Sequence, residues 1–429
     1  MREMVKTDIP WMPEISSDFS VGYVKQYFFV SKDLSNDGEP ERVLKLARAG
    51  IVEKDVTTNE GQMAASYAGY NKVCVGDLLL NPMDLYSGAN CNVSELNGVI
   101  SPAYSNLRAK KTGTVVPKYY DYYFKSQYWL MAMFAHGKGV SFDNRWTLNN
   151  DALRSYEIPV APYAMQQKIV DAIQDGEKKV DSLIANVQAQ IEKLKAYKQS
   201  LITEVVTKGL DPNAPMKDSE LPWFGLIPRH WKLAKIKMYA TTCSGGTPPS
   251  GDMSYYNGKI NWVCSYDLRE KEIEETEKTL SDKGAEHIAG TLQLPNSILV
   301  AMYGGAGTIG NSGLLKCYAR TNQAICSIHF DEAVVEPKFA FYQTMFIRRY
   351  WMFFAVGTRK DPNISQDIVR NMKYVIPPIQ EQTAIATYLD AKCSQIDQLI
   401  SLKESKIEKL QQYKRSLIYE YVTGKKEVS

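Results

Sequence analysis

Residues 181–207 read DSLIANVQAQIEKLKAYKQSLITEVVT, and residues 397–423 read DQLISLKESKIEKLQQYKRSLIYEYVT. The two stretches align without a gap at an offset of 216 residues, and 15 of the 27 aligned positions are identical. Two unrelated helices that share only a periodicity would not agree this often. A repeat spaced at about half the chain length predicts two supersecondary units built twice in one chain.

Both copies have the periodicity of a coiled coil. Apolar residues step by four and three positions without an intervening proline, which predicts a long helix with a narrow apolar seam. The first helix is expected from about Met165 to Thr207, a length of roughly 65 Å. The seam needs a partner, and we expect the other copy, in antiparallel orientation; a surface helix packed on a globular body is the alternative. The predicted seam residues are Ile184, Ile191, Leu194 and Leu201 in the first copy and Ile400, Ile407, Leu410 and Leu417 in the second.

The repeat divides the chain into alternating globular and helical segments. We predict an α+β fold in which two similar α/β domains are joined by two long helices that form an antiparallel intramolecular coiled coil with pseudo-two-fold symmetry. Each domain opens near a Pro-Trp pair, and a proline break precedes each helix. The predicted segments are a first domain at 1–158, a first long helix at 159–209, a linker with the second domain at 210–374, and a second long helix with a basic tail at 375–429.

Length and composition are those of an ordinary globular protein. The 429 residues suffice for two or three domains, and the net charge of +3 gives no global basic field. Seven cysteines without a CxxC pair favour reduced thiols and a cytoplasmic location over a disulfide framework. The sequence has no apolar run of membrane-spanning length and no secretory signal at its start, so we expect no membrane segment.

Patterns that carry catalysis are incomplete in this chain. Residues 305–310 match GxGxxG, but residues 311–313 interrupt the helix that a dinucleotide site needs, so we expect a glycine-rich turn between strands. Residues 81–84 read NPMD and lack the aromatic ring with which adenine methyltransferases stack a flipped base. The four histidines lack metal-ligand spacing, and no phosphate-binding loop is present. We predict no catalytic and no metal site, and therefore a binding or scaffold chain.

Several phrases of the sequence, taken in order, resemble the specificity subunit of a type I restriction-modification system. The resemblance extends over nearly the whole chain. The phrases are VTKGLDPN at 206–213, LPWFGLIPRHW at 221–231, GGTP at 245–248, AMYG at 301–304, TNQA at 321–324, NIS at 363–365, IPPIQEQ at 376–382, GDLLLN at 76–81 and VISPAY at 99–104. The first half departs from the family pattern at residues 161–167, APYAMQQ, which lack the usual double proline and acid.

The resemblance implies a non-catalytic DNA-binding subunit. Each globular domain would be a target recognition domain that reads one half of a bipartite site in double-stranded DNA, and the helices would set the gap and dock two methyltransferase subunits. Those subunits would bind S-adenosylmethionine and methylate adenine N6. Restriction subunits with a motor would use ATP and magnesium to cleave DNA, in defence against foreign DNA. This chain would bind no cofactor itself.

Candidate DNA contacts follow from side-chain chemistry, because arginine reads guanine, asparagine or glutamine reads adenine, and lysine suits phosphate. The candidates are Tyr104, Arg108, Lys110, Lys111 and Arg145 in the first domain and Tyr303, Arg320, Asn322, Gln323, Arg359 and Lys360 in the second. Asn322 and Gln323 suit structural hydrogen bonds equally well. The Lys-Lys and Arg-Lys pairs lie in turn-like contexts, which slightly favours phosphate contacts.

Three other functions are compatible with the sequence. The chain would serve equally as the specificity part of a related two-subunit system that methylates and cuts nearby. It would also suit a scaffold whose coiled coil carries two protein-binding domains, whereas a stand-alone methyltransferase is disfavoured by the missing motifs. Salt distinguishes DNA from a protein partner, because DNA affinity falls steeply with added salt through counterion release.

Overall fold

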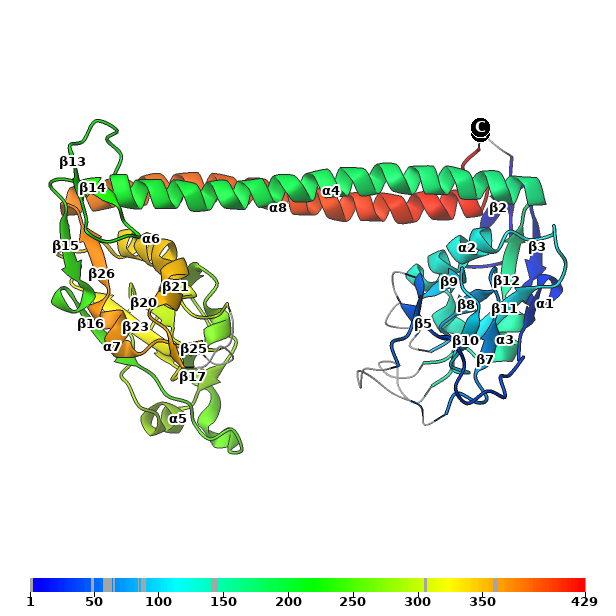
Figure 1. Ribbon diagram of the computed structural model, residues 1–429, viewed down its shortest axis with the longest axis horizontal. Coiled ribbons are helices and arrows are strands. Elements are labelled where there is room, and N and C mark those ends of the chain that lie inside the picture. Colours follow the sequence, from blue (N-terminus) through cyan, green and yellow to red (C-terminus); the bar gives the residue numbers. More distant parts are fainter. Residues whose placement is uncertain are drawn as a thin grey trace. The chain divides into compact units, whose positions relative to one another are not determined.

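The structure, a computed structural model, divides into two compact units. Unit 1 comprises Met1–Gln188 and Glu404–Ser429, and unit 2 comprises Ala189–Lys403. Each unit therefore holds one globular region and a part of each long helix (Figure 1). The residues described are 3–47, 50–56, 64, 66–83, 85, 90–139, 146–304, 307–357 and 362–428.

The globular region of unit 1 is built on two four-stranded sheets. Their strand orders are β6-β5-β10-β7 and β4-β11-β8-β9, and the pairs β1-β2 and β12-β3 complete the unit. The strands are β1 (Met4–Lys6), β2 (Glu14–Ser16), β3 (Ser20–Tyr23), β4 (Phe28–Val30), β5 (Val43–Ala47), β6 (Gly50–Glu53), β7 (Asn71–Val73), β8 (Leu78–Leu80), β9 (Cys91–Val93), β10 (Gly98–Ile100), β11 (Ser105–Ala109) and β12 (Glu157–Val160).

One aromatic helix forms much of the core of unit 1. Helix α2 (Pro117–Trp129) begins with proline, whose fixed φ suits the first helical turn, and it packs against β8 and β9. Its side chains are buried on nearly all sides, as expected of a helix inside a core. The other short helices are α1 (Val24–Tyr27), η1 (Met133–His136) and α3 (Asn150–Arg154).

The globular region of unit 2 is built on a five-stranded sheet of order β16-β23-β20-β21-β18. A three-stranded sheet, β19-β17-β22, and the pairs β13-β14, β15-β26 and β24-β25 complete the unit. The strands are β13 (Met216–Asp218), β14 (Leu226–Pro228), β15 (Lys232–Lys235), β16 (Ala240–Ser244), β17 (Tyr256–Val263), β18 (Lys271–Ile273), β19 (Thr279–Leu280), β20 (Ile298–Ala301), β21 (Ser312–Leu315), β22 (Ala319–Thr321), β23 (Ile325–Phe330), β24 (Val356–Gly357), β25 (Pro362–Asn363) and β26 (Lys373–Ile376).

Unit 2 repeats the framework of unit 1. Strands β8 and β11 pair antiparallel below α2, and β20 and β23 pair antiparallel beside α6 (Pro337–Ile347). Both helices start at a proline, and the two prolines lie 220 residues apart, as do the first residues of β8 and β20. The remaining short helices of unit 2 are η2 (Ile236–Met238), η3 (Met253–Tyr255), η4 (Ser265–Asp267), α5 (Asp282–His287), η5 (Arg348–Phe353) and α7 (Gln366–Asn371).

The long helices α4 (Tyr163–Lys208) and α8 (Ile379–Val422) lie side by side in unit 2 (Figure 1). Lys198 Nζ lies 2.7 Å from Asp397 Oδ2, and Lys403 Nζ lies 2.5 Å from Gln190 Oε1. Residue numbers therefore fall along α4 as they rise along α8. The helices of this unit are antiparallel.

The same two helices are antiparallel in unit 1. Lys414 Nζ lies 2.9 Å from Asp181 Oδ2. A Cβ atom added to Gly176 would stand 2.6 Å from Leu417 Cδ2, so the two helices approach closely there. Asp181 and Lys414 match Asp397 and Lys198 at the repeat offset, so both units use the same ion pair with the helices exchanged.

These contacts confirm the predicted α+β class and the antiparallel intramolecular coiled coil. All eight predicted seam residues are buried or half-buried. Helix α4 begins two residues before the expected Met165 and ends at Lys208. At about 1.5 Å per residue its 46 residues span about 69 Å. The segment with the GxGxxG pattern joins β20 to β21, as expected of a turn between strands, although Gly305 and Ala306 lie outside the described residues.

Candidate nucleic-acid interface

Four loops of unit 2 meet where β20 ends and β23 begins. Met302, just after β20, donates its backbone N–H to the carbonyl of Ala324 at 2.7 Å and accepts from the N–H of Ile364 at 2.9 Å. The N–H of Gly246 donates to the carbonyl of Thr321 at 2.9 Å. The phrases GGTP, AMYG, TNQA and NIS, which are scattered in the sequence, therefore form one loop surface.

Glycine is required where the GGTP loop crosses the TNQA turn. A Cβ atom on Gly245 would stand 1.8 Å from the carbonyl oxygen of Thr321, a distance that no side chain can occupy. Gly290, which lies beside the same loop, has a φ of +89°, a conformation that glycine adopts without strain. The close backbone approach fixes the shape of the loop surface, because neither position can accept a larger residue without a shift of the chain.

Gln323 is the predicted DNA contact best placed on this surface. Its side chain is exposed, and its Oε1 accepts a hydrogen bond from the hydroxyl of Thr247. The bond orients the amide and leaves its N–H donors toward solvent, where a ligand can meet them. Tyr303 lies nearby, next to Met302, and it is half-buried against the core; this burial raises the pKa of its hydroxyl, which stays protonated.

Two other candidates of unit 2 support the loops. Asn322 accepts the backbone N–H of Ala324 on its Oδ1 at 3.1 Å, which closes the turn. The guanidinium of Arg320 donates to the carbonyl of Gly290, and its buried Nε has no partner among the described residues. Arg359 and Lys360 lie outside the described residues.

The candidates of unit 1 are less concentrated. Tyr104 packs against the small cluster of Leu44, Leu46, Val73, Leu79 and Ile100. Lys110 Nζ donates to the carbonyl of Lys25 at 2.6 Å and lies 5.1 Å from the ring centre of Phe29. Lys111 is exposed, and Arg145 lies outside the described residues.

Arg108 is held by a buried carboxylate. Its Nε and Nη2 donate to the two oxygens of Asp77 at 2.8 and 2.7 Å, and Asn106 Nδ2 donates to the same carboxylate at 3.0 Å. The hydrogen bonds to Asp77 raise the pKa of the guanidinium, so the pair is charged at all relevant pH. These contacts give Arg108 a role in holding β8 against β11.

Sequence reasoning missed the residues that position the contacts. Thr247 orients Gln323, and Trp262 donates its indole N–H to the carbonyl of Gly246 at 3.2 Å. Asp77 neutralises Arg108 in the same indirect way. The phrases GGTP and GDLLLN contain two of these residues, but nothing in the sequence tells which partner each one binds.

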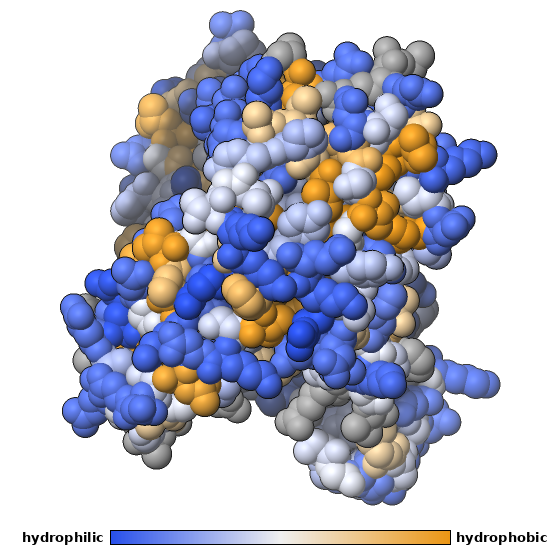
Figure 2. All heavy atoms as spheres, turned by 90° about the vertical axis from the view of Figure 1, so that its right-hand side faces the viewer, coloured by the Kyte–Doolittle hydropathy of each residue, from blue (hydrophilic) through white to orange (hydrophobic). Residues whose placement is uncertain are grey.

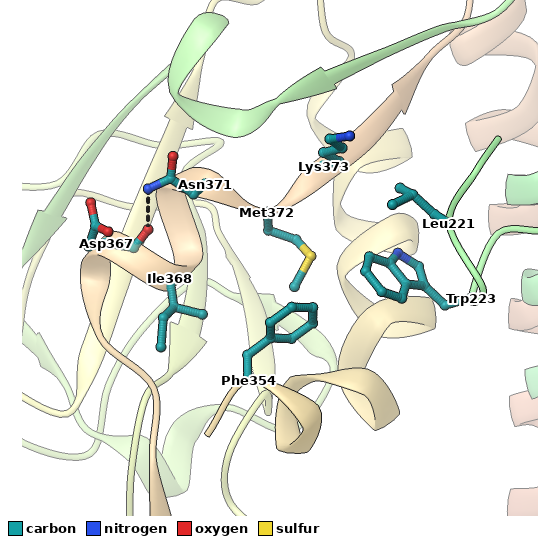
Figure 3. A pocket seen from close by; sticks show the side chains of 8 residues that line it. All are labelled: Leu221, Trp223, Phe354, Asp367, Ile368, Asn371, Met372 and Lys373. Carbon is teal, nitrogen blue, oxygen red and sulfur yellow. Dashed lines mark hydrogen bonds between the residues drawn. The ribbon is translucent and has the colours of Figure 1, made fainter. Parts of the chain in front are cut away.

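A separate hollow of about 320 Å³ lies in unit 2 (Figure 3). Its walls are mainly apolar, with Leu221 and Trp223 facing Phe354 and Met372, and the amide of Asn371 is bonded to the carbonyl of Asp367 at 2.9 Å. None of the predicted DNA contacts lines it. The hollow is therefore distinct from the loop surface.

The described residues present a mixed surface. Their helices include none that is long and apolar enough to span a membrane. Hydrophilic side chains cover most of the face drawn in Figure 2, where hydrophobic ones form separate patches. No described group of His, Cys, Asp or Glu is arranged to hold a metal ion.

Comparison with known proteins gives a consistent result. Residues 228–412 match the family model of the type I restriction modification DNA specificity domain. The chain is 23% identical over 414 residues to the type I restriction enzyme MjaVIII specificity subunit of Methanocaldococcus jannaschii, covering 93% of this chain and 86% of that one.

Two solved structures share the fold. One, from work on complex assembly and conformational transition of the type I restriction-modification system, has a TM-score of 0.70 and 13% identity and covers 95% of this chain and 98% of its own. The HsdS subunit from Thermoanaerobacter tengcongensis has a TM-score of 0.51 and 13% identity, with 96% and 98% covered. Together with the ordered phrases, the repeat and the antiparallel coiled coil, these matches lead to one conclusion. The chain belongs to the specificity subunits of type I restriction-modification systems.

Proposed function

We propose that this chain gives a type I restriction-modification complex its DNA sequence specificity, with each globular region reading one half of a bipartite site. Family membership supports the DNA-reading role. The division into two units, each with its own core and its own sheets, supports two independent readers.

The observation that carries the proposal is a shared framework with different side chains at one place. The turn before β23 reads TNQA at 321–324, and the turn before β11, which pairs with the matching strand, reads SPAY at 101–104. A framework that holds one shape and changes the exposed groups suits two readers of different half-sites, because base edges are distinguished by donors, acceptors and apolar contacts.

The long helices set the gap between half-sites in this proposal. Helix α4 spans about 69 Å, and one turn of B-DNA is about 34 Å, so the helix length corresponds to about two turns. The same helices would dock two methyltransferase subunits, which bind S-adenosylmethionine. Restriction subunits would supply ATP-dependent cleavage. No chemical step is assigned to this chain.

Sequencing of methylated DNA tests the proposal. The chain, purified with the methyltransferase subunit of its system, would be incubated with S-adenosylmethionine and a random DNA library, and N6-methyladenine would be mapped. We expect two short fixed sequences separated by a constant gap. One continuous sequence would contradict two separate readers, and methylation without a fixed sequence would contradict the specificity role.

A further inference from the structure

Each unit exposes one leucine and one tyrosine on its part of the long helices. In unit 1, Leu183 on α4 is 50% exposed and Tyr413 on α8 is 51% exposed. In unit 2, Tyr197 on α4 is 57% exposed and Leu399 on α8 is 47% exposed. These four residues, called here the flank pairs, belong to neither the seam nor a globular core.

Both members of a flank pair lie on the same side of the seam. Leu183 directly precedes the seam residue Ile184, and Tyr413 directly precedes Lys414, which occupies a seam position. In an antiparallel pair, the positions just before these seam residues border the seam on one side of both helices. Because Asp181 contacts Lys414, Leu183 and Tyr413 are also level along the helix axes.

The flank pair of unit 2 has the same arrangement. Tyr197 precedes Lys198, and Leu399 precedes Ile400. The contact between Lys198 and Asp397 places Tyr197 and Leu399 at one level. Each unit thus carries one leucine beside one tyrosine on one side of its coiled coil.

The flank pairs are retained in both copies of the repeat. Leu183 matches Leu399, and Tyr197 matches Tyr413, at the offset of 216 residues. Elsewhere 12 of the 27 aligned positions differ, mostly at polar, exposed places. An exposed apolar residue gains nothing from packing within its own unit, so its presence at both sites indicates that something covers it in each unit.

Charge beside the flank pairs restricts what covers them. Lys193 and Lys409 stand four residues before the two tyrosines, on the same helix face, and both are exposed. The opposite border of the seam carries Asp181 and Asp397. A surface of leucine, tyrosine and lysine matches a protein segment with an apolar ridge and acidic neighbours. A DNA backbone would use the lysines but would leave the leucines without a partner.

We propose that the flank pairs dock two copies of one protein partner, one copy on each unit, through a helix with an apolar ridge and an acidic border. The partner is the methyltransferase subunit, so the inference rests on the proposed function and assigns the docking to one side of the coiled coil. Tyrosine at the centre of the contact makes each site a hot spot.

Stoichiometry measured on the full chain tests the proposal. The wild-type chain mixed with purified methyltransferase subunit should bind two copies by native mass spectrometry. The variant L183S/Y413S should bind one copy, since affinity at unit 1 falls by about 30-fold. Y197S/L399S should also bind one copy, and the fourfold variant should bind none at concentrations that saturate the wild type.

Exposed tyrosines elsewhere on the long helices provide matched controls. Tyr163 is 47% exposed and Tyr388 is 36% exposed, and neither recurs in the other copy. Y163S and Y388S should keep both copies bound, and thermal melts of every variant should match the wild type. Two bound copies in a double variant would overturn the proposal, as would a wild-type chain that binds none. A loss of DNA binding alone would indicate DNA on this surface instead.

The docking surface and the proposed function fail in different ways. If the wild-type complex contains two methyltransferase subunits but methylates no fixed sequence, the specificity role fails and the docking surface stands. If a split sequence is methylated while the double variants keep two copies, only the docking surface is overturned.

Discussion

Gln166 and Gln382 lie at matching positions near the start of α4 and α8, and both side chains are fully buried. The Oε1 atom of Gln382 accepts the N–H of Glu336 at 2.9 Å, and its Nε2 donates to the carbonyls of Val334 and Pro377. Gln166 makes the equivalent bonds in unit 1, to the loop before α2. In both units one amide fastens the long helix to the globular region.

Replacing Gln382 with leucine should lower the free energy of unfolding by about 3 kcal/mol. The change leaves one N–H and two carbonyls near the helix start without their partner, and each buried orphan costs about 1–3 kcal/mol. Urea unfolding measures the effect. Gln380→Leu is the control, since Gln380 is exposed one half-turn away. Equal losses in both variants would contradict the role of the buried amide.

Replacing Gln323 with alanine should weaken binding to DNA that carries the correct base in one half-site. A good side-chain contact to a base contributes about 1–3 kcal/mol of discrimination. Competition binding against DNA changed in either half-site measures the loss, and it should vanish when the affected half-site is already changed. A uniform loss on random DNA would show that Gln323 contacts phosphate.

At the scale of elements, the long helices could be predicted and the sheets of the globular regions largely could not. The helices carry a seam of several heptads, so a periodic signal survives over more than 40 residues. Many strands have only three or four residues, such as β8 with three leucines all buried, and so short a run has no periodicity. The candidate site was predicted in part because its phrases were recognisable, but the pairing of Thr247 with Gln323 depends on a fold that brings distant loops together.

Lysine in the seam is explained by the exchange of ion pairs between helices. Lys198 is 23% exposed at its side chain, and its partner Asp397 is 55% exposed. A pair with this exposure contributes little to stability, about 0–1 kcal/mol. Its charge marks one register, because a shifted pairing would place Lys198 against apolar residues.

Lys198→Leu should therefore raise the free energy of unfolding by about 1 kcal/mol, since a leucine there buries more apolar surface than the ion pair is worth. Thermal melting of the full chain measures the change. Asp397→Asn is the companion variant and should cost less than about 1 kcal/mol. A large loss on Lys198→Leu would mean that the ion pair stabilises the helices more than its exposure indicates.

At the scale of the whole molecule, α4 and α8 should act as the measure of the DNA gap. Adding the same seven residues to both helices, after Gln188 in α4 and after Lys403 in α8, keeps the seam in step and lengthens both by about 10 Å. We expect methylation of a split sequence with a longer gap, mapped as above. The same insertion in one helix alone breaks the seam and should abolish methylation. An unchanged gap in the double insertion would contradict the role of the helices.

The exchanged ion pairs have a consequence for the gene. Each helix contains both an aspartate and a lysine of the pairing chemistry, since Asp181 and Lys198 lie in one copy and Asp397 and Lys414 in the other. A crossover between the two repeats in the coding sequence would delete 216 codons and fuse one globular region to one helix. That helix is complementary to itself, with its aspartate facing the lysine of an identical molecule. The present gene has the form that duplication and fusion of such a self-pairing ancestor would produce.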